Sequence, residues 1–207
     1  MGADAEILAV ALDALRDLGL GKDDIVARIS DRRLLAAILE SAGVPETKFL
    51  TAFEVVDKVE REERARSIQR LQEECDLGAS EAEGLLGLVE DGGLEDVARL
   101  HGDNPVVAGA LGEMQEFTEI LNNLGLGEFI QVDLKILRGL AYYTGTVFET
   151  FLTELPGIGS VCSGGRYDDL SSLYTKQRLP GIGGSLGVDR LIAAMEELGL
   201  VDESAAT

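Results

Sequence analysis

Three short stretches in the last third of the sequence place arginine, tyrosine and aspartate among glycines. The first covers residues 137–145 and reads LRGLAYYTG, with Arg138 before a glycine and Tyr142 and Tyr143 after it. A guanidinium can bind a carboxylate or a phosphate through two parallel hydrogen bonds, and phenol groups can contact a polar ring. The stretch indicates either a small-molecule cavity or a hairpin with two half-buried tyrosines, which is common in sheets.

The second stretch, residues 163–169, reads SGGRYDD. Gly164 and Gly165 would let the backbone approach a ligand closely and direct N–H groups at anionic oxygens, and Arg166 would add a fixed positive charge. A glycine turn closed by a surface Arg–Asp pair is the alternative explanation of the same spacing.

The third stretch, residues 180–190, reads PGIGGSLGVDR. Its glycines are only superficially like a dinucleotide-binding loop, because no acidic residue follows at the required distance and no GK[ST] motif is present. A strand over residues 184–187 that leads into a helix from Val188 is the better interpretation. Arg190 would then lie in the first turn of that helix and point from the sheet edge toward a bound phosphate.

The other candidate residues do not form a metal site or a catalytic triad. His101 is the single histidine and has no Cys or carboxylate set at ligand spacing, so we interpret it as a surface or capping residue. Cys75 and Cys162 are too few for a disulfide scaffold and suit a reducing cytoplasm. We therefore expect no metal ligands among the site residues.

The elements that must position these stretches begin with a helix, a strand and a second helix. Apolar residues at helical spacing predict a helix over residues 5–18, capped by Asp4. β-branched residues predict a short strand over residues 24–30, after which Ser30 or Asp31 can cap the next helix. This order is typical of the flank of an α/β or α+β sheet.

The middle and the end of the chain differ in pattern. Residues 44–126 have helical periodicity throughout, and residues 43–126 carry 19 acidic and 7 basic side chains. Strand-forming residues and glycine turns follow, and they predict antiparallel strands over residues 129–133, 145–152 and 157–162. A final helix from Val188 is expected to bury Leu191, Ile192, Met195 and Leu198. The sequence therefore predicts a small helical module between elements of a sheet.

Composition excludes several classes of protein. The chain is 45% hydrophobic and 27% charged, which is usual for a soluble globular protein and not for a disordered one. No apolar run approaches the roughly 18 residues that a membrane span needs, so we expect no membrane association. The formal net charge of -20 argues against nucleic-acid binding through the overall field of this chain.

Taken together, the order and spacing of the three stretches resemble the two histidine-specific motifs and class II motif 3 of the histidyl-tRNA synthetases. The resemblance implies an α+β fold, with a partial class II antiparallel sheet flanked by helices and an all-helical insertion that contacts the tRNA acceptor region. It divides the chain into residues 1–42 and 127–207 of the catalytic core, with the insertion at 43–126. Motifs 1 and 2 and the anticodon-binding domain are expected outside this chain.

The resemblance also implies roles for individual residues. Arg138 would lie against the histidine carboxylate and the α-phosphate of ATP, where its guanidinium neutralises the charge that develops on phosphorus. Arg190 would hold the γ-phosphate of ATP, which is expected to carry Mg²⁺. The implied histidine-binding residues are Arg138, Tyr142, Tyr143, Gly164, Gly165 and Tyr167, with the glycines in a loop, and the implied ATP-binding residues are Arg138, Gly187 and Arg190.

The implied function is that of a piece of a histidine–tRNA ligase, which joins histidine to ATP and then to tRNA. We expect the piece alone to be inactive or nearly so, because motif 2 binds substrate. The related regulatory subunit of ATP phosphoribosyltransferase is the alternative, although retention of Arg138, both tyrosines and Arg190 favours the ligase. Ala141 replaces the usual Asp of the family, which affects histidine selectivity. Unpaired strand edges predict self-association.

Overall fold

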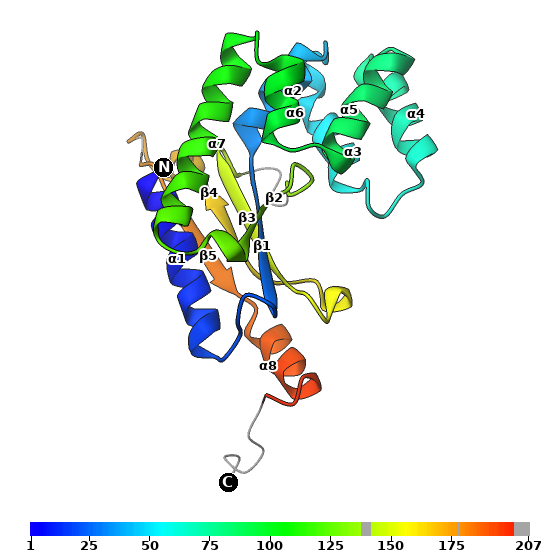
Figure 1. Cartoon of the computed structure of the whole chain (residues 1–207). Helices are drawn as coiled ribbons and strands as arrows, with labels where there is room; N and C mark the ends of the chain where they lie inside the picture. Colours follow the sequence, from blue (N-terminus) through cyan, green and yellow to red (C-terminus); the bar gives the residue numbers. More distant parts are fainter. Residues whose placement is uncertain (138–141, 178, 201–207) are drawn as a thin grey trace.

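A computed structural model describes residues 1–137, 142–177 and 179–200 (Figure 1). Its centre is a five-stranded sheet with the strand order β2-β1-β3-β4-β5. Eight α-helices surround this sheet among the described residues. The architecture is therefore α+β, as the sequence predicts.

The chain begins with the helix, strand and helix that the sequence predicts. They are α1 (Gly2–Asp17), β1 (Ile25–Asp31) and α2 (Arg32–Ser41). Asp31 caps α2, because its carboxylate accepts the backbone N–H of Arg33 at 2.7 Å. The predicted cap of α1 is wrong: the helix already starts at Gly2, and Asp4 lies within its first turn.

Every α-helix and 3₁₀ turn between α2 and the second strand follows the helical periodicity of the sequence. Asn104 caps the longest of these helices through the N–H of Val106, and Pro105 occupies the first helical position, where its missing N–H costs no hydrogen bond. The elements are η1 (Glu46–Lys48), α3 (Phe49–Asp57), α4 (Arg64–Cys75), α5 (Ala79–Asp91), α6 (Leu94–His101), α7 (Pro105–Asn123) and η2 (Gly127–Phe129).

The sheet is mostly antiparallel, with one parallel pair that the sequence does not predict. Strand β2 (Ile130–Val132) runs parallel to β1, with Ala27 opposite Ile130. Strands β3 (Thr146–Leu152), β4 (Ser160–Arg166) and β5 (Ile182–Leu186) are antiparallel to their neighbours. The connection between β3 and β4 is the expected hairpin, closed by the short turn η3 (Pro156–Ile158).

Helices α1 and α7 lie against one face of the sheet and leave the other face for the candidate site (Figure 1). The buried core joins this helix layer to the sheet through residues such as Leu8 and Leu12 of α1 and Ile29 of β1. No helix among the described ranges is long and apolar enough to cross a membrane.

The last two elements follow β4 along the chain. The turn η4 (Leu170–Leu173) precedes β5, and α8 (Val188–Glu197) packs against β4. The predicted buried stripe of α8 is partly wrong. Leu191 and Ala194 form its buried side, whereas Ile192 is exposed, because only one narrow face of this helix meets the sheet.

Candidate functional site

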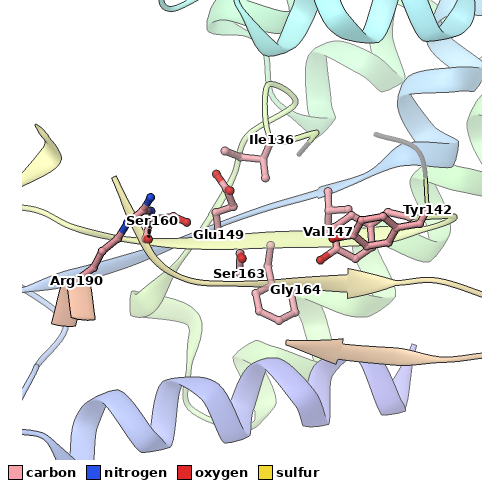
Figure 2. Close-up of a pocket in the computed structure, with 10 residues that line it drawn as sticks. Ile136, Tyr142, Val147, Glu149, Ser160, Ser163, Gly164 and Arg190 are labelled. Carbon is pink, nitrogen blue, oxygen red and sulfur yellow. Dashed lines mark hydrogen bonds between the residues drawn. The ribbon is translucent and has the colours of Figure 1, made fainter. Parts of the chain in front are cut away.

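A cavity of about 210 Å³ lies on the sheet face that α1 and α7 leave open. Figure 2 shows Glu149 between Ile136 and Ser163, with Ser160 and Arg190 at one end and Tyr142 and Val147 at the other. The cavity therefore brings together residues of all three glycine-rich stretches, with Tyr142 and Tyr143 of the first, Ser163 and Gly164 of the second and Arg190 of the third. Its polar lining consists of Tyr142, Tyr143, Glu149, Ser160, Ser163 and Arg190.

Two stacked phenols form one end of the cavity. The ring centroids of Tyr142 and Tyr143 are 4.4 Å apart and the rings are tilted by 54°. Burial, together with a hydrogen bond to Tyr142, raises the pKa of Tyr143 well above its ordinary value of 10.0. Tyr143 is therefore a neutral phenol at physiological pH, able to donate or accept a hydrogen bond in the cavity.

A buried carboxylate lies in the middle of the cavity, and the sequence analysis missed it. Glu149 is 4% exposed and stands directly opposite Ser163 in the β3–β4 ladder. Both side chains line the cavity. The signal that could have found Glu149 is its position as the single charged residue within the strand TVFETFL, because a charge is rarely buried in a strand without a specific role.

The opposite end of the cavity holds the arginine of the third stretch. Arg190 lies in the first turn of α8, and its Nη1 donates to the backbone oxygen of Ser160 at 2.9 Å. A second, more open hollow of about 510 Å³ continues from this point along β4 and β5 and is lined by Gly187 and Ser185 as well as Arg190. Arg190 lies in the first turn of this helix, as the sequence predicts, and lines both hollows.

The glycines of the second stretch do not form the predicted loop, since Gly164 and Gly165 lie within β4. Gly164 is covered by the ring of Phe148, and an added Cβ on Gly165 would stand 2.9 Å from Cδ1 of Tyr143. Because these two residues have no side chains, aromatic rings can pack on the strand there. The rings therefore occupy space that was predicted for a ligand close to the backbone. Gly164 still contributes to the cavity wall beside Phe148.

Tyr167 does not line the cavity together with Tyr142 and Tyr143. Its ring packs on the other glycine strand: an added Cβ on Gly181 would stand 2.6 Å from Cε2 of Tyr167. Its backbone N–H donates to the oxygen of Gly181 at 2.8 Å. Tyr167 therefore packs against the β4–β5 pair. The structure does not bring it into the cavity with the other residues predicted to bind histidine.

Arg166 is predicted from the sequence to present a positive charge to a ligand. In the structure its guanidinium instead forms ion pairs with carboxylates. It pairs with Asp168 at 2.9 Å and with Asp4 of α1 at 2.7 Å, so an Arg–Asp pair is present, but it closes no glycine turn and is largely buried. The hydrogen bond to Asp4 is the main reason that the pKa of Arg166 is raised. Arg138, the predicted catalytic group, lies outside the described residues.

The described part of the chain contains no set of metal ligands. No group of three or more His, Cys, Asp or Glu side chains there is arranged to hold a metal ion. His101 lies at the end of α6 with Nδ1 3.0 Å from the hydroxyl oxygen of Ser41. Cys75 and Cys162 are buried free thiols.

Known proteins resemble this chain over nearly all of its length. The histidine–tRNA ligase of Rhodopirellula baltica is 40% identical over 203 residues, which make up 95% of this chain and 45% of that protein. The histidine–tRNA ligase of Wolinella succinogenes is 39% identical over 210 residues, covering 98% of this chain and 47% of that protein. The chain thus spans about half the length of the curated relatives that it matches.

Solved structures also resemble this chain over nearly all of its length. The histidyl-tRNA synthetase of Nostoc sp. PCC 7120 superposes with a TM-score of 0.85 at 27% identity, covering 97% of this chain and 48% of that one. A structure from Bacillus halodurans described as an ATP phosphoribosyltransferase regulatory subunit/histidyl-tRNA synthetase has a TM-score of 0.77 at 24% identity, which shows the shared fold alone. It covers 93% of this chain and 49% of that one. A family model described as histidyl-tRNA synthetase matches residues 1–191, so the chain belongs to the histidyl-tRNA synthetase family.

Proposed function

We propose that this chain forms the part of a histidine–tRNA ligase that holds histidine and the phosphate end of ATP. The observation that carries the proposal is the single cavity in which Tyr142 and Tyr143 face Arg190 across a buried carboxylate. Phenols at one end and a guanidinium at the other match a ligand with a polar ring and an anionic group. Histidine bound beside the triphosphate of ATP has both features.

The tyrosine end of the cavity would bind the imidazole ring of histidine. A neutral Tyr143 can accept from one imidazole nitrogen or donate to the other, and its ring is held against that of Tyr142. Arg138, outside the described residues, is proposed for the carboxylate and the α-phosphate. Its guanidinium would stabilise the negative charge that forms on phosphorus when the carboxylate attacks and pyrophosphate leaves.

The arginine end would bind ATP. The more open hollow beside Arg190 and Gly187 has room for phosphates, and Arg190 would contact the terminal one. Since the described residues offer no metal ligand set, we assign no step to protein-bound Mg²⁺, which would accompany the nucleotide. The proposed part of Gly187 is to leave the hollow open at the start of α8.

The whole ligase would use residues outside this chain as well. We propose that residues 1–42 and 127–207 belong to its catalytic core and that the acidic helical segment 43–126 is inserted to reach the tRNA acceptor region. The 207 residues alone are expected to catalyse little or no histidine-dependent pyrophosphate exchange. The cytoplasm is the proposed location, where tRNA, ATP and histidine are available.

Calorimetric titration with a non-hydrolysable histidyl-adenylate analogue tests the proposal. Binding of this analogue should weaken roughly tenfold or more in Tyr143→Phe, which loses a hydrogen bond to the imidazole. In a parallel titration, binding of a non-hydrolysable ATP analogue should weaken by a similar factor in Arg190→Ala, which loses its contact with the terminal phosphate. Arg99→Ala, which removes an exposed arginine paired with Asp96 on α6, is the matched control and should bind as the parent does. Analogue binding that is absent in the parent, or equal in all variants, would contradict the proposed site.

The phosphoribosyltransferase regulatory subunit remains the second candidate function, because a structure with that description shares the fold. The position of Arg190 at the junction of the two hollows favours the ligase, since a histidine sensor does not require a group for ATP phosphates. Titration with histidine and with ATP separately distinguishes the two. Histidine binding without any ATP binding, together with co-purification of a phosphoribosyltransferase, would favour the regulator.

A further inference from the structure

The first turn of α1 is tied to the end of β4 by a buried ion pair. Asp4 is 1% exposed, and its two carboxylate oxygens accept from Arg166 Nε at 2.9 Å and Nη2 at 2.7 Å. This two-pronged geometry holds both the position and the plane of the guanidinium. The remaining nitrogen, Nη1, donates to Asp168 at 2.9 Å, so each of the three guanidinium nitrogens donates to a carboxylate.

The residues around Arg166 in turn hold the segment that carries the tyrosines. The backbone N–H of Thr144 donates to the oxygen of Arg166 at 2.7 Å, and the N–H of Asp168 donates to the hydroxyl of Thr144 at 3.0 Å. An added Cβ on Gly145 would stand 3.1 Å from Cδ of Arg166, so the arginine stem covers the chain there. Tyr143, the preceding neighbour of Thr144, rests its ring on the strand residue before Arg166.

We propose that Asp4 and Arg166 are positioning residues for the tyrosine end of the cavity: Asp4 holds the arginine, and the arginine and its neighbours hold Tyr143 and Thr144. Neither Asp4 nor Arg166 lines the cavity, so they act through the tyrosines and not on a ligand directly. The effect on ligand binding rests on the proposed function, whereas the effect on Thr144 does not.

Hydrogen exchange and calorimetry on the full 207-residue chain test this inference. The variants are Asp4→Asn, which removes one charge, and Arg166→Lys, which keeps the charge but loses the two-pronged contact. Asp13→Asn is the matched control, because Asp13 pairs with Arg16 on the exposed side of the same helix. Exchange is measured at the amide of Thr144 and, as an internal reference, at the amides of the β1–β3 ladder.

We expect exchange at Thr144 to accelerate roughly tenfold or more in both variants while the β1–β3 amides keep their protection. Affinity for the histidyl-adenylate analogue should fall by roughly ten- to a hundredfold, as a displaced binding group predicts. Asp13→Asn should change neither quantity. Should Asp4→Asn fail to fold, Arg166→Lys carries the test, since it retains the positive charge opposite Asp4.

Two results would overturn the inference. One is equal loss of protection at Thr144 and in the β1–β3 ladder, which means that the pair contributes only global stability. The other is unchanged exchange at Thr144 in Arg166→Lys. If exchange changes as expected but the parent chain does not bind the analogue, the positioning role stands and the proposed function fails. The two claims therefore fail separately.

Discussion

The ring of Tyr143 lies on Gly165 of the neighbouring strand, and an added Cβ would stand 2.9 Å from its Cδ1 atom and 2.7 Å from the backbone oxygen of Thr146. Real Cβ atoms do not approach other atoms this closely, so the glycine is required by the tyrosine above it. One wall of the candidate cavity thus depends on the absence of a single carbon atom.

Gly165→Ala is accordingly expected to displace the ring of Tyr143. Overpacking of this kind costs about 1–3 kcal/mol of unfolding free energy, and the displaced phenol should weaken binding of the adenylate analogue. Urea denaturation and calorimetry measure the two effects. Gly157→Ala, at a position with open space around it, is the control and should change stability by less than about 0.5 kcal/mol. A stable Gly165→Ala chain with unchanged binding would contradict the expectation.

Cys162 should make the stability of the chain depend on pH in the alkaline range. Burial raises the pKa of its thiol from 9.0 to about 11. The folded state therefore retains a proton that the unfolded state releases, and the stabilisation present below pH 9 is lost as the pH rises toward 11. The loss is up to about 3 kcal/mol.

Denaturant titrations of the parent and of Cys162→Ala at several pH values measure this contribution. The substitution should flatten the decline between pH 9 and 11. Cys75→Ala is the matched control, because burial raises the pKa of that thiol too. The loss of stability that is due to Cys162 should remain in Cys75→Ala. An unchanged slope in Cys162→Ala would rule out the thiol as its source.

His101 is expected to destabilise the fold on mild acidification. Partial burial lowers its pKa below the ordinary value of 6.5, so protonation favours the unfolded chain and stability falls as the pH drops through this range. His101 is the single histidine of the sequence, which makes its NMR titration unambiguous. A midpoint at or above 6.5, or an equal acid sensitivity in His101→Gln, would contradict this prediction.

Self-association is expected at the outer edge of β5. In the described part of the chain β4 is the one strand that pairs with β5, and the exposed side chains of Val10 and Leu186 line an apolar hollow of about 210 Å³ between α1 and β5. An unpaired edge next to apolar surface favours pairing with another chain. Light scattering should therefore show a dimer or larger species in the parent chain.

Leu186→Lys tests where that association occurs, because a lysine at a strand edge opposes pairing. The variant should shift the chain toward the monomer. Val106→Lys replaces a more exposed apolar residue near the start of α7 and should leave the assembly unchanged. A parent chain that is monomeric at all concentrations, or a Leu186→Lys chain that associates as before, would contradict the prediction.

Local signals in the sequence were sufficient for the helices. Asp31 caps α2 by accepting two backbone N–H groups, and Gly19 ends α1 in the left-handed region with a φ of 92°. Such signals act within a few residues, so they can be read from composition and spacing. The parallel pairing of β1 with β2 lacks any local signal, because the partners of Ala27 and Ile29 lie beyond the entire helical segment.

The arrangement of the candidate site could be predicted from the sequence only in part, for the same reason. Tyr142, Tyr143 and Arg190 belong to one cavity, as their residue types suggested. The loop expected at Gly164 and Gly165 is instead part of β4, because the sequence does not reveal that Phe148 of β3 and Tyr143 of the segment before β3 would cover these glycines. Likewise, nothing in the spacing shows that Asp4, more than 160 residues away, would bind Arg166.

The pairing of β1 also has a consequence for how the chain folds. Ala27 and its partner Ile130 are about a hundred residues apart, and β3 lies further along still. A sheet built from such distant segments has high contact order and forms slowly, because a long loop must close before its contacts stabilise anything. During synthesis on the ribosome, β1 leaves the exit tunnel well before either neighbour exists. The helices of residues 43–126 can form during that delay, so the chain is expected to become helical first and to complete its sheet last.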